Sequence, residues 1–338
     1  MFVISRPSLQ LNIDAHHRQT PILTLGALWA GGIVSPANPL YTADELAFQL
    51  RDSRAKGLVT QPANLPTALL AAKKAGLPVN RILLLGTHPN TTTTTTTTTQ
   101  TPAHFTTIRT THATTKPPIL PSLDLAFLVY SSGTTGLPKG VTLTHHNMVA
   151  NLLQASFIEA HQWRTHPSPI TQLGILPFFH IYGLTCGVLL SVYEGWRLVV
   201  LSRFDMVRVL QLIDRYKVTF MYVPPPVVLA FSKHPAVADR RYDLSSLRVL
   251  HSGAAPLSRE LTERVWDRVG VPVKQGFGLS ETSAVVCCQR VGEWRGFMGS
   301  VGRLVPNMVA RIVDGEGGDV GEGEVWLFFL PFYFITGK

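Results

Sequence analysis

The chain has 338 residues, of which 45% are hydrophobic and 15% are charged. This composition excludes a disordered, highly charged chain and predicts one large or two smaller globular domains. Lysine and arginine total 30 against 21 aspartates and glutamates, which gives a net charge of +9, but the basic residues are scattered along the chain. Solubility together with some binding of an anionic small molecule therefore accounts for the charge better than nucleic-acid binding does.

The three cysteines, Cys186, Cys287 and Cys288, form no CxxC pair. Adjacent cysteines rarely bridge, so a disulfide scaffold and a zinc finger are both excluded. No apolar segment reaches the roughly 18 to 20 residues that a membrane helix needs. Residues 1–12 lack a continuous apolar stretch, so we expect no signal peptide.

Residues 1–86 predict alternating strands and helices. Thr42 and Glu45 have the spacing of a capping box at the start of a helix. Residues 57–60 predict a strand, residues 65–75 a helix that ends at Gly76, and residues 81–85 a buried strand. This order favours a parallel sheet.

Residues 87–121 are rich in threonine and proline and include nine consecutive threonines. Such a composition cannot bury apolar surface, so we expect a disordered surface loop there.

Residues 122–326 resume the alternation and predict a core of the α/β class. Strands are expected at residues 125–130, 141–143, 198–201, 218–223, 247–250 and 273–275. Thr144, Asp205 and Ser258 are expected to cap the helices that follow them.

The most distinctive motif is residues 130–140, which read Tyr-Ser-Ser-Gly-Thr-Thr-Gly-Leu-Pro-Lys-Gly between two expected strands. Its glycines permit a tight turn, its hydroxyls and amides can donate to phosphate oxygens, and Lys139 adds a positive charge. It is not a Walker P-loop, because Pro138 replaces the second glycine and a strand follows instead of a helix. We interpret it as a phosphate loop; the alternative is a turn without a ligand.

A second motif, residues 275–282, reads Gln-Gly-Phe-Gly-Leu-Ser-Glu-Thr after a strand. We expect a glycine turn there, where open α/β sheets bind ligands. Ser280 can donate to a phosphate and Glu281 can bind Mg²⁺. The alternative is a glycine turn with a solvated glutamate.

Two weaker motifs complete the set. Residues 252–256, Ser-Gly-Ala-Ala-Pro, leave space for a flat ring against the backbone, or they form a simple small-residue turn. Residues 176–183 carry aromatics and one histidine ahead of an apolar helix. Tyr182 there can line an acyl pocket, whereas His180 on its own is more typical of a buried core histidine. No motif supports a serine hydrolase.

The order and spacing of these four motifs resemble the adenylate-forming superfamily, most closely the 4-coumarate–CoA ligase-like acyl-CoA synthetases. The resemblance implies the large N-terminal domain of that fold, with parallel-rich sheets packed against helices and with residues 122–326 as its nucleotide- and acyl-binding core. It also implies a two-step reaction in which a carboxylic acid and ATP give acyl-AMP, which CoA then converts to a thioester. ATP, Mg²⁺ and CoA are the expected cofactors and co-substrates.

The resemblance also implies site residues. The expected phosphate loop consists of Ser131, Ser132, Gly133, Thr134, Thr135 and Gly136, together with Lys139. The expected nucleotide contacts are Gly253, Ala254, Ala255, Gln275, Gly276, Phe277 and Ser280. His180, Tyr182 and Gly276 are expected to form the acid pocket, and Arg203 to lie near CoA. Lys139, Ser280 and Glu281 are the expected catalytic residues, with Glu281 as the Mg²⁺ ligand.

Family members extend further at both ends, so we expect an incomplete large domain without the small C-terminal domain, and residues 327–338 read as an atypical tail. Impaired activity is the corresponding expectation. The alternative is a non-catalytic nucleotide-binding remnant or a gene-model fragment, while nucleic-acid binding rests on the net charge alone. Relatives are cytoplasmic or peroxisomal, and the final Thr-Gly-Lys is not a peroxisomal signal.

Overall fold

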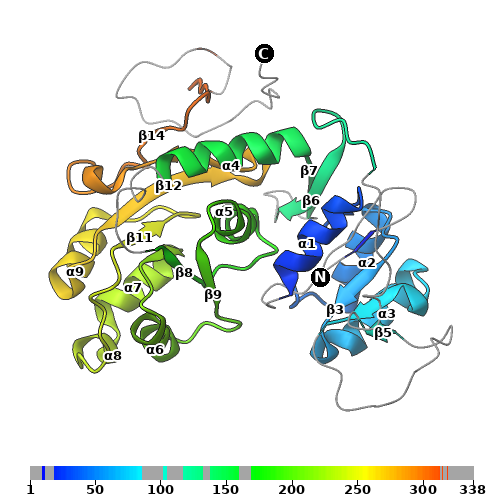
Figure 1. Ribbon diagram of the computed structural model, residues 1–338, viewed down its shortest axis with the longest axis horizontal. Coiled ribbons are helices and arrows are strands. Elements are labelled where there is room, and N and C mark those ends of the chain that lie inside the picture. The colour runs from blue at the N-terminus through cyan, green and yellow to red at the C-terminus, as the bar shows by residue number, and fades with distance from the viewer. Residues whose placement is uncertain are drawn as a thin grey trace.

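The computed structural model describes residues 10–11, 19–85, 102–104, 117–131, 138–159, 169–312, 314 and 318. Within these ranges the chain forms three sheets packed against helices, so the α/β class is confirmed (Figure 1). None of the helices in these ranges is long and apolar enough to cross a membrane.

The smallest sheet lies in the N-terminal part of the chain. Its parallel strands, in order, are β3 (Leu58–Thr60), β4 (Ile82–Leu84) and β5 (Ala103–His104). Helices α2 (Ala43–Asp52) and α3 (Leu65–Ala75) pack on it, flanked by short 3₁₀ turns at η1 (Pro62–Asn64) and η2 (Val79–Arg81). The predicted capping box at Thr42 and Glu45 is present, and Gly76 ends α3 in the left-handed region at φ 71°.

Strand β5 corrects the expectation of a loop without structure over residues 87–121. Ala103 and His104 pair with Leu83 and Leu84 of β4, which gives the backbone groups at the edge of β4 hydrogen-bond partners. Residues 87–101 and 105–116 of that predicted loop lie outside the described residues.

The second sheet carries the most distinctive motif. Its strands, in order, are β1 (Gln10–Leu11), β2 (Ile33–Val34), β6 (Leu125–Ser131) and β7 (Lys139–Thr144), and α1 (Thr20–Trp29) precedes β2. Strands β6 and β7 are antiparallel, with Ser131 opposite Lys139. The two strands expected around the phosphate loop are therefore confirmed, while residues 132–137 lie outside the described residues.

The third and largest sheet has seven strands. They are, in order, β14 (Arg303–Leu304), β13 (Ala284–Cys288), β12 (Val273–Leu279), β11 (Val249–Ser252), β10 (Phe220–Val223), β8 (Thr171–Gly174) and β9 (Arg197–Val200). The five strands from β12 to β9 run parallel, and β13 and β14 add antiparallel pairings at one edge.

Helices cover both faces of this sheet. Helices α6 (Met206–Tyr216), α7 (Pro225–Lys233) and α9 (Arg259–Val269) pack on one face, with the short α8 (Pro235–Ala238) beside them. Helix α4 (His145–Glu159), the π-helix η4 (Gly183–Leu189) and α5 (Leu190–Tyr193) pack on the other face. Buried residues therefore alternate along β10, where Phe220 and Tyr222 face η4 and Met221 and Val223 face α7.

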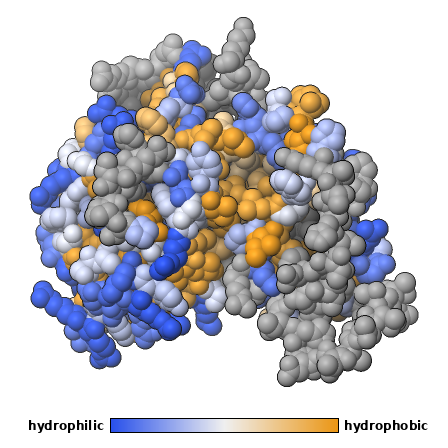
Figure 2. Space-filling view, viewed as in Figure 1, coloured by the Kyte–Doolittle hydropathy of each residue, from blue (hydrophilic) through white to orange (hydrophobic). Residues whose placement is uncertain are grey.

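Helix α4 joins the two larger sheets. It contacts β7 at its start and β13 along its length, and Figure 1 shows it lying across both. Its predicted cap is confirmed, because the backbone N–H of Asn147 donates to Thr144 Oγ1 at 3.1 Å. Asp205 and Ser258 likewise accept from the first turns of α6 and α9. In Figure 2, hydrophobic side chains gather in the hollowed centre of the visible face.

Strand β12 corrects the expectation of a glycine turn after residue 275. The strand continues to Leu279, with a bulge between Phe277 and Gly278 where it pairs with β13. A Cβ atom on Gly278 would lie 1.6 Å from the carbonyl oxygen of Ala284. Glycine is required at this position because another backbone passes close by, not because the chain turns.

Candidate functional site

A cavity of about 540 Å³ opens where the β6–β7 hairpin meets the ends of β11 and β12. Such a position, beyond the carboxyl ends of parallel strands, is typical of ligand sites in open α/β sheets. The lining residues are Ser131, Lys139, His180, Ile181, Tyr182, Cys186, His251, Gly253, Ala254, Gly276, Phe277, Gly278, Leu279, Ser280, Glu281, Ala284, Val285 and Cys287.

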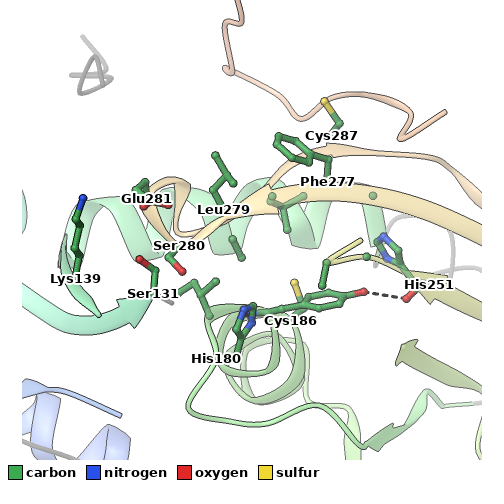
Figure 3. A pocket seen from close by; sticks show the side chains of 18 residues that line it. Ser131, Lys139, His180, Cys186, His251, Phe277, Leu279, Ser280, Glu281 and Cys287 are labelled. Atoms are coloured by element: carbon green, nitrogen blue, oxygen red, sulfur yellow. Dashed lines mark hydrogen bonds between the residues drawn. The ribbon is translucent and has the colours of Figure 1, made fainter. Parts of the chain in front are cut away.

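One end of the cavity is polar, and we call it the rim, defined by Ser131, Lys139, Ser280 and Glu281 (Figure 3). The hairpin contributes Ser131 and Lys139, and the 3₁₀ turn η5 (Ser280–Thr282) contributes the other two. Thr282 Oγ1 accepts from the Leu279 N–H at 3.1 Å, which fixes this turn against the end of β12. Lys139 and Glu281 are both exposed, so their charges face a solvated opening.

A hydrogen bond anchors the base of the hairpin. The Tyr130 hydroxyl donates to Asp52 of α2 at 2.5 Å. Burial and the Asp52 carboxylate raise the pKa of Tyr130, so the phenol stays protonated and remains a donor. The strand that presents Ser131 is therefore tied to the N-terminal helices.

Opposite the rim lies an aromatic surface, which we call the wall. It is defined by Tyr182 ahead of η4, Gly253 after β11 and Phe277 on β12. The Tyr182 hydroxyl donates to the backbone carbonyl of His251 at 2.9 Å, and a Cβ on Gly253 would lie 3.1 Å from the Tyr182 ring. Burial raises the pKa of Tyr182, which keeps this donor protonated. Gly253 thus permits close contact between the end of β11 and the aromatic wall.

His180 is exposed at the cavity, so it is not the buried core histidine that was the alternative. Its Nδ1 accepts from the backbone N–H of Tyr182 at 3.2 Å, which leaves the proton on Nε2. Protein atoms on the other sides of the ring partly desolvate it and lower its pKa. A neutral imidazole with a free N–H therefore borders the cavity.

The structure brings together most, but not all, of the residues predicted for the site. Those that line the cavity are Ser131, Lys139, His180, Tyr182, Gly253, Ala254, Gly276, Phe277, Ser280 and Glu281. Ala255 and Gln275 do not line it; Gln275 is buried, and its N–H donates to Gln289 Oε1 at 2.8 Å. Arg203 is exposed between β9 and α6, away from the cavity lining. Ser132, Gly133, Thr134, Thr135 and Gly136 lie outside the described residues.

Several lining residues were not predicted. They are Ile181, Cys186, His251, Gly278, Leu279, Ala284, Val285 and Cys287. Three of them lie on β13, a strand that the sequence analysis did not assign. His251 directly precedes the predicted small-residue motif, and a histidine within a buried strand is a signal that could have marked it.

Next to the cavity lie three potential metal ligands, Glu159, His251 and Cys288, whose ligand atoms are within 4.8 Å of one another. The Lys274 ammonium lies 2.7 Å from both Glu159 oxygens, however, and takes the place of a cation. These donors therefore form an ion-paired cluster and do not suit a metal.

The chain is similar to known proteins in sequence and in structure. The family model described as AMP-binding enzyme matches residues 16–337. A probable 4-coumarate–CoA ligase 1 from Dictyostelium discoideum is 37% identical over 308 residues, which cover 88% of this chain and 55% of that protein. A long-chain-fatty-acid–CoA ligase from Bacillus subtilis (strain 168) is 34% identical over 322 residues, 89% of this chain and 56% of that protein.

Among solved structures, ATP-bound MatB from Rhodopseudomonas palustris superposes with a TM-score of 0.76 at 24% identity, covering 93% of this chain and 58% of that one. This likeness shows the fold, which is that of adenylate-forming enzymes. The chain spans about half the length of the relatives that it matches.

Proposed function

This chain belongs to the AMP-binding enzyme family, and on that premise we propose that it activates a carboxylic acid with ATP to form acyl-AMP and then transfers the acyl group to CoA. The observation that carries the proposal is a single cavity with a polar, charged rim at one end and an aromatic, apolar wall at the other. A nucleoside triphosphate needs a polar, charged surface, and an acyl group needs an apolar one.

The rim supplies the groups that hold a triphosphate. The hydroxyls of Ser131 and Ser280 can donate to phosphate oxygens, and the Lys139 ammonium offsets their charge. Glu281 offers the kind of oxygen ligand that Mg²⁺ prefers, so the donor set fits the metal. When bound, Mg²⁺ adds positive charge at the phosphates.

The acid lies between the rim and the wall in this proposal. The free Nε2–H of His180 donates to the carboxylate and orients it, while Tyr182 and Phe277 exclude water from the acyl group. The carboxylate oxygen attacks the α-phosphorus and pyrophosphate leaves; Ser280 and Lys139 stabilise the growing negative charge. The CoA sulfur then displaces AMP from the acyl carbon.

The test is acid-dependent release of pyrophosphate from Mg-ATP, run with aromatic and aliphatic acids. We expect release to depend on the acid and to fall at least about 10-fold in Lys139→Met, since one charge-stabilising donor is lost. Lys217→Met, which removes an exposed lysine paired with Asp214 and Asp243, is the matched control and should behave as wild type. Mg-ATP binding by calorimetry without acid-dependent release would instead indicate a nucleotide-binding protein without ligase activity.

A further inference from the structure

A charged cluster is buried directly behind the wall of the cavity. Glu159 at the end of α4, His251 on β11 and Lys274 on β12 have side chains that are 3%, 5% and 0% exposed. Lys274 Nζ lies 2.7 Å from each Glu159 oxygen and donates to the Gln289 carbonyl at 3.2 Å. His251 Nδ1 lies 2.7 Å from Glu159 Oε1.

The charges in this cluster are compensated. Burial alone would raise the pKa of Glu159, but the Lys274 charge and the hydrogen bonds from His251 and Lys274 overcome it and lower the pKa to about 2. Burial would lower the pKa of Lys274, yet the charge and the hydrogen bonds of the Glu159 carboxylate raise it. The pair is therefore an ionised carboxylate and an ammonium whose charges cancel.

This arrangement determines the state of His251. An ionised carboxylate 2.7 Å away requires a proton on Nδ1. Burial and the Lys274 charge outweigh the opposing effect of Glu159 and lower the pKa of His251, which keeps the ring neutral and leaves Nε2 as an acceptor. The other titratable groups near the ring are Tyr182, Tyr222, Cys186 and Cys288. Burial raises the pKa of each of these four groups, so all stay uncharged.

Nε2 lies on the side of the ring that faces the cavity. A Cβ on Gly276, a lining residue, would be 2.5 Å from His251 Nε2. The glycine at position 276 therefore leaves the cavity side of this nitrogen without a Cβ, while the Sγ of Cys288, which does not line the cavity, lies 3.9 Å from the same nitrogen. Figure 3 places His251 at the end of the cavity opposite Lys139, Ser280 and Glu281, and thus far from the rim.

We propose that Glu159 and Lys274 are positioning residues of the site: the buried pair fixes the neutral, Nδ1-protonated form of His251 and turns Nε2 toward the cavity as a hydrogen-bond acceptor. Neither residue lines the cavity, so both act through His251. Resting on the proposed function, the consequence is a preference for an acid that carries a donor group at the end remote from its carboxylate.

The first experiment measures the histidine itself and needs no substrate. Nitrogen-15 NMR of the labelled chain should show the His251 proton on Nδ1, with the ring titrating below its ordinary pH range. The variant Glu159→Gln/Lys274→Met removes both charges at similar volume, so no buried charge is left unpaired. We expect both ring tautomers to be populated in this variant. Lys217→Met, an exposed lysine outside the cavity, is the matched control and should leave the His251 signals unchanged.

A wild-type ring protonated on Nε2, or a His251 spectrum identical in wild type and the double variant, would overturn the proposal. Unfolding midpoints of all variants, measured alongside, separate a change of tautomer from a loss of fold.

The second experiment measures recognition of the acid. Calorimetry in the presence of Mg-ATP should show that 4-hydroxycinnamate binds about 2- to 10-fold more tightly than its 4-methoxy counterpart, the value of one neutral hydrogen bond. The double variant should lose this ratio and keep its affinity for Mg-ATP. An unchanged ratio refutes the positioning role. If wild type binds neither acid, the predicted preference is refuted, while acid-dependent pyrophosphate release still decides the proposed function and the NMR experiment still decides the state of His251.

Discussion

A carboxylate and a lysine stand at the rim of the cavity, and a second such pair is buried behind its opposite end, so the two pairs have opposite surroundings. At the rim, Lys139 and Glu281 are exposed and face solvent. Behind the wall, Glu159 and Lys274 are 3% and 0% exposed and in contact at 2.7 Å. Charges exposed to water are screened and can interact with a ligand, whereas opposite charges in a protein interior interact strongly with each other. The comparison suggests that the rim binds the ligand and that the buried pair positions His251.

The first prediction concerns the loss of one partner from the buried Glu159–Lys274 pair. Lys274→Met should destabilise the fold by about 3–5 kcal/mol, because it leaves the Glu159 carboxylate buried without its counter-ion. Urea unfolding measures the effect. Adding Glu159→Gln to the same chain should recover most of the loss, and Lys217→Met at an exposed pair should cost no more than about 1 kcal/mol. Equal costs for the two lysine substitutions would contradict the distinction between the two ends.

The second prediction concerns the stability that is lost when Glu159 is protonated at low pH. The folded-state pKa of Glu159, about 2, lies below its ordinary value of 4.5. The stability that it contributes is therefore complete above the ordinary value and is lost as the pH falls from there toward 2. Unfolding free energies measured across this range should fall less steeply in Glu159→Gln/Lys274→Met. The same slope in both proteins would show that Glu159 is not ionised in the folded chain.

The third prediction probes the wall between the two ends. In Gly276→Ala the new Cβ meets His251 Nε2 at 2.5 Å and the Cys287 carbonyl at 3.0 Å. Overpacking of this kind costs about 1–3 kcal/mol. We expect weaker binding of the acid and unchanged affinity for Mg-ATP, both measured by calorimetry. Gly292→Ala, where a Cβ meets no atom within 4 Å, is the control.

The fourth prediction concerns the loss of the Glu281 carboxylate from the rim. Glu281→Gln should weaken Mg-ATP binding about 10-fold, or about 1.4 kcal/mol, because a charged metal ligand is lost. The exposed side chain contributes little to folding, so the unfolding free energy should change by less than about 0.5 kcal/mol. Calorimetry with Glu293→Gln, an acidic residue outside the cavity lining, provides the reference. Identical affinities in the two variants would remove Glu281 from the metal site.

Local signals in the sequence predicted much of this fold. The caps at Thr42, Asp205 and Ser258 depend on residues only three positions apart, and all three are present. The hairpin strands around the phosphate loop and the strand–helix–strand unit at β3 and β4 were also correct. Interactions within one helical turn or one strand pair are readable because both partners lie close together in the sequence.

The parts that sequence reasoning missed depend on distant partners. Glycine is disfavoured in strands, so the continuation of β12 through Gly276 and Gly278 required knowledge of His251 and Ala284 beside it. Glu159 and Lys274 are 115 residues apart, and no short motif links them. A lysine within the strand predicted at residues 273–275 was the available signal, because a buried ammonium demands a partner.

Strand β12 has one further consequence. It starts at the buried pair, passes along the cavity at Gly276 and Phe277, and delivers Ser280 and Glu281 to the rim. A strand advances about 3.3 Å per residue and is stiff along its length, so it acts as a ruler between the two ends. Inserting one residue between Phe277 and Gly278 would move Ser280 and Glu281 by about one such step relative to Lys274, while Ser131 and Lys139 of the hairpin would keep their places. The number of residues in β12 therefore sets the distance from Lys274, behind the cavity, to Ser280 and Glu281 at the rim.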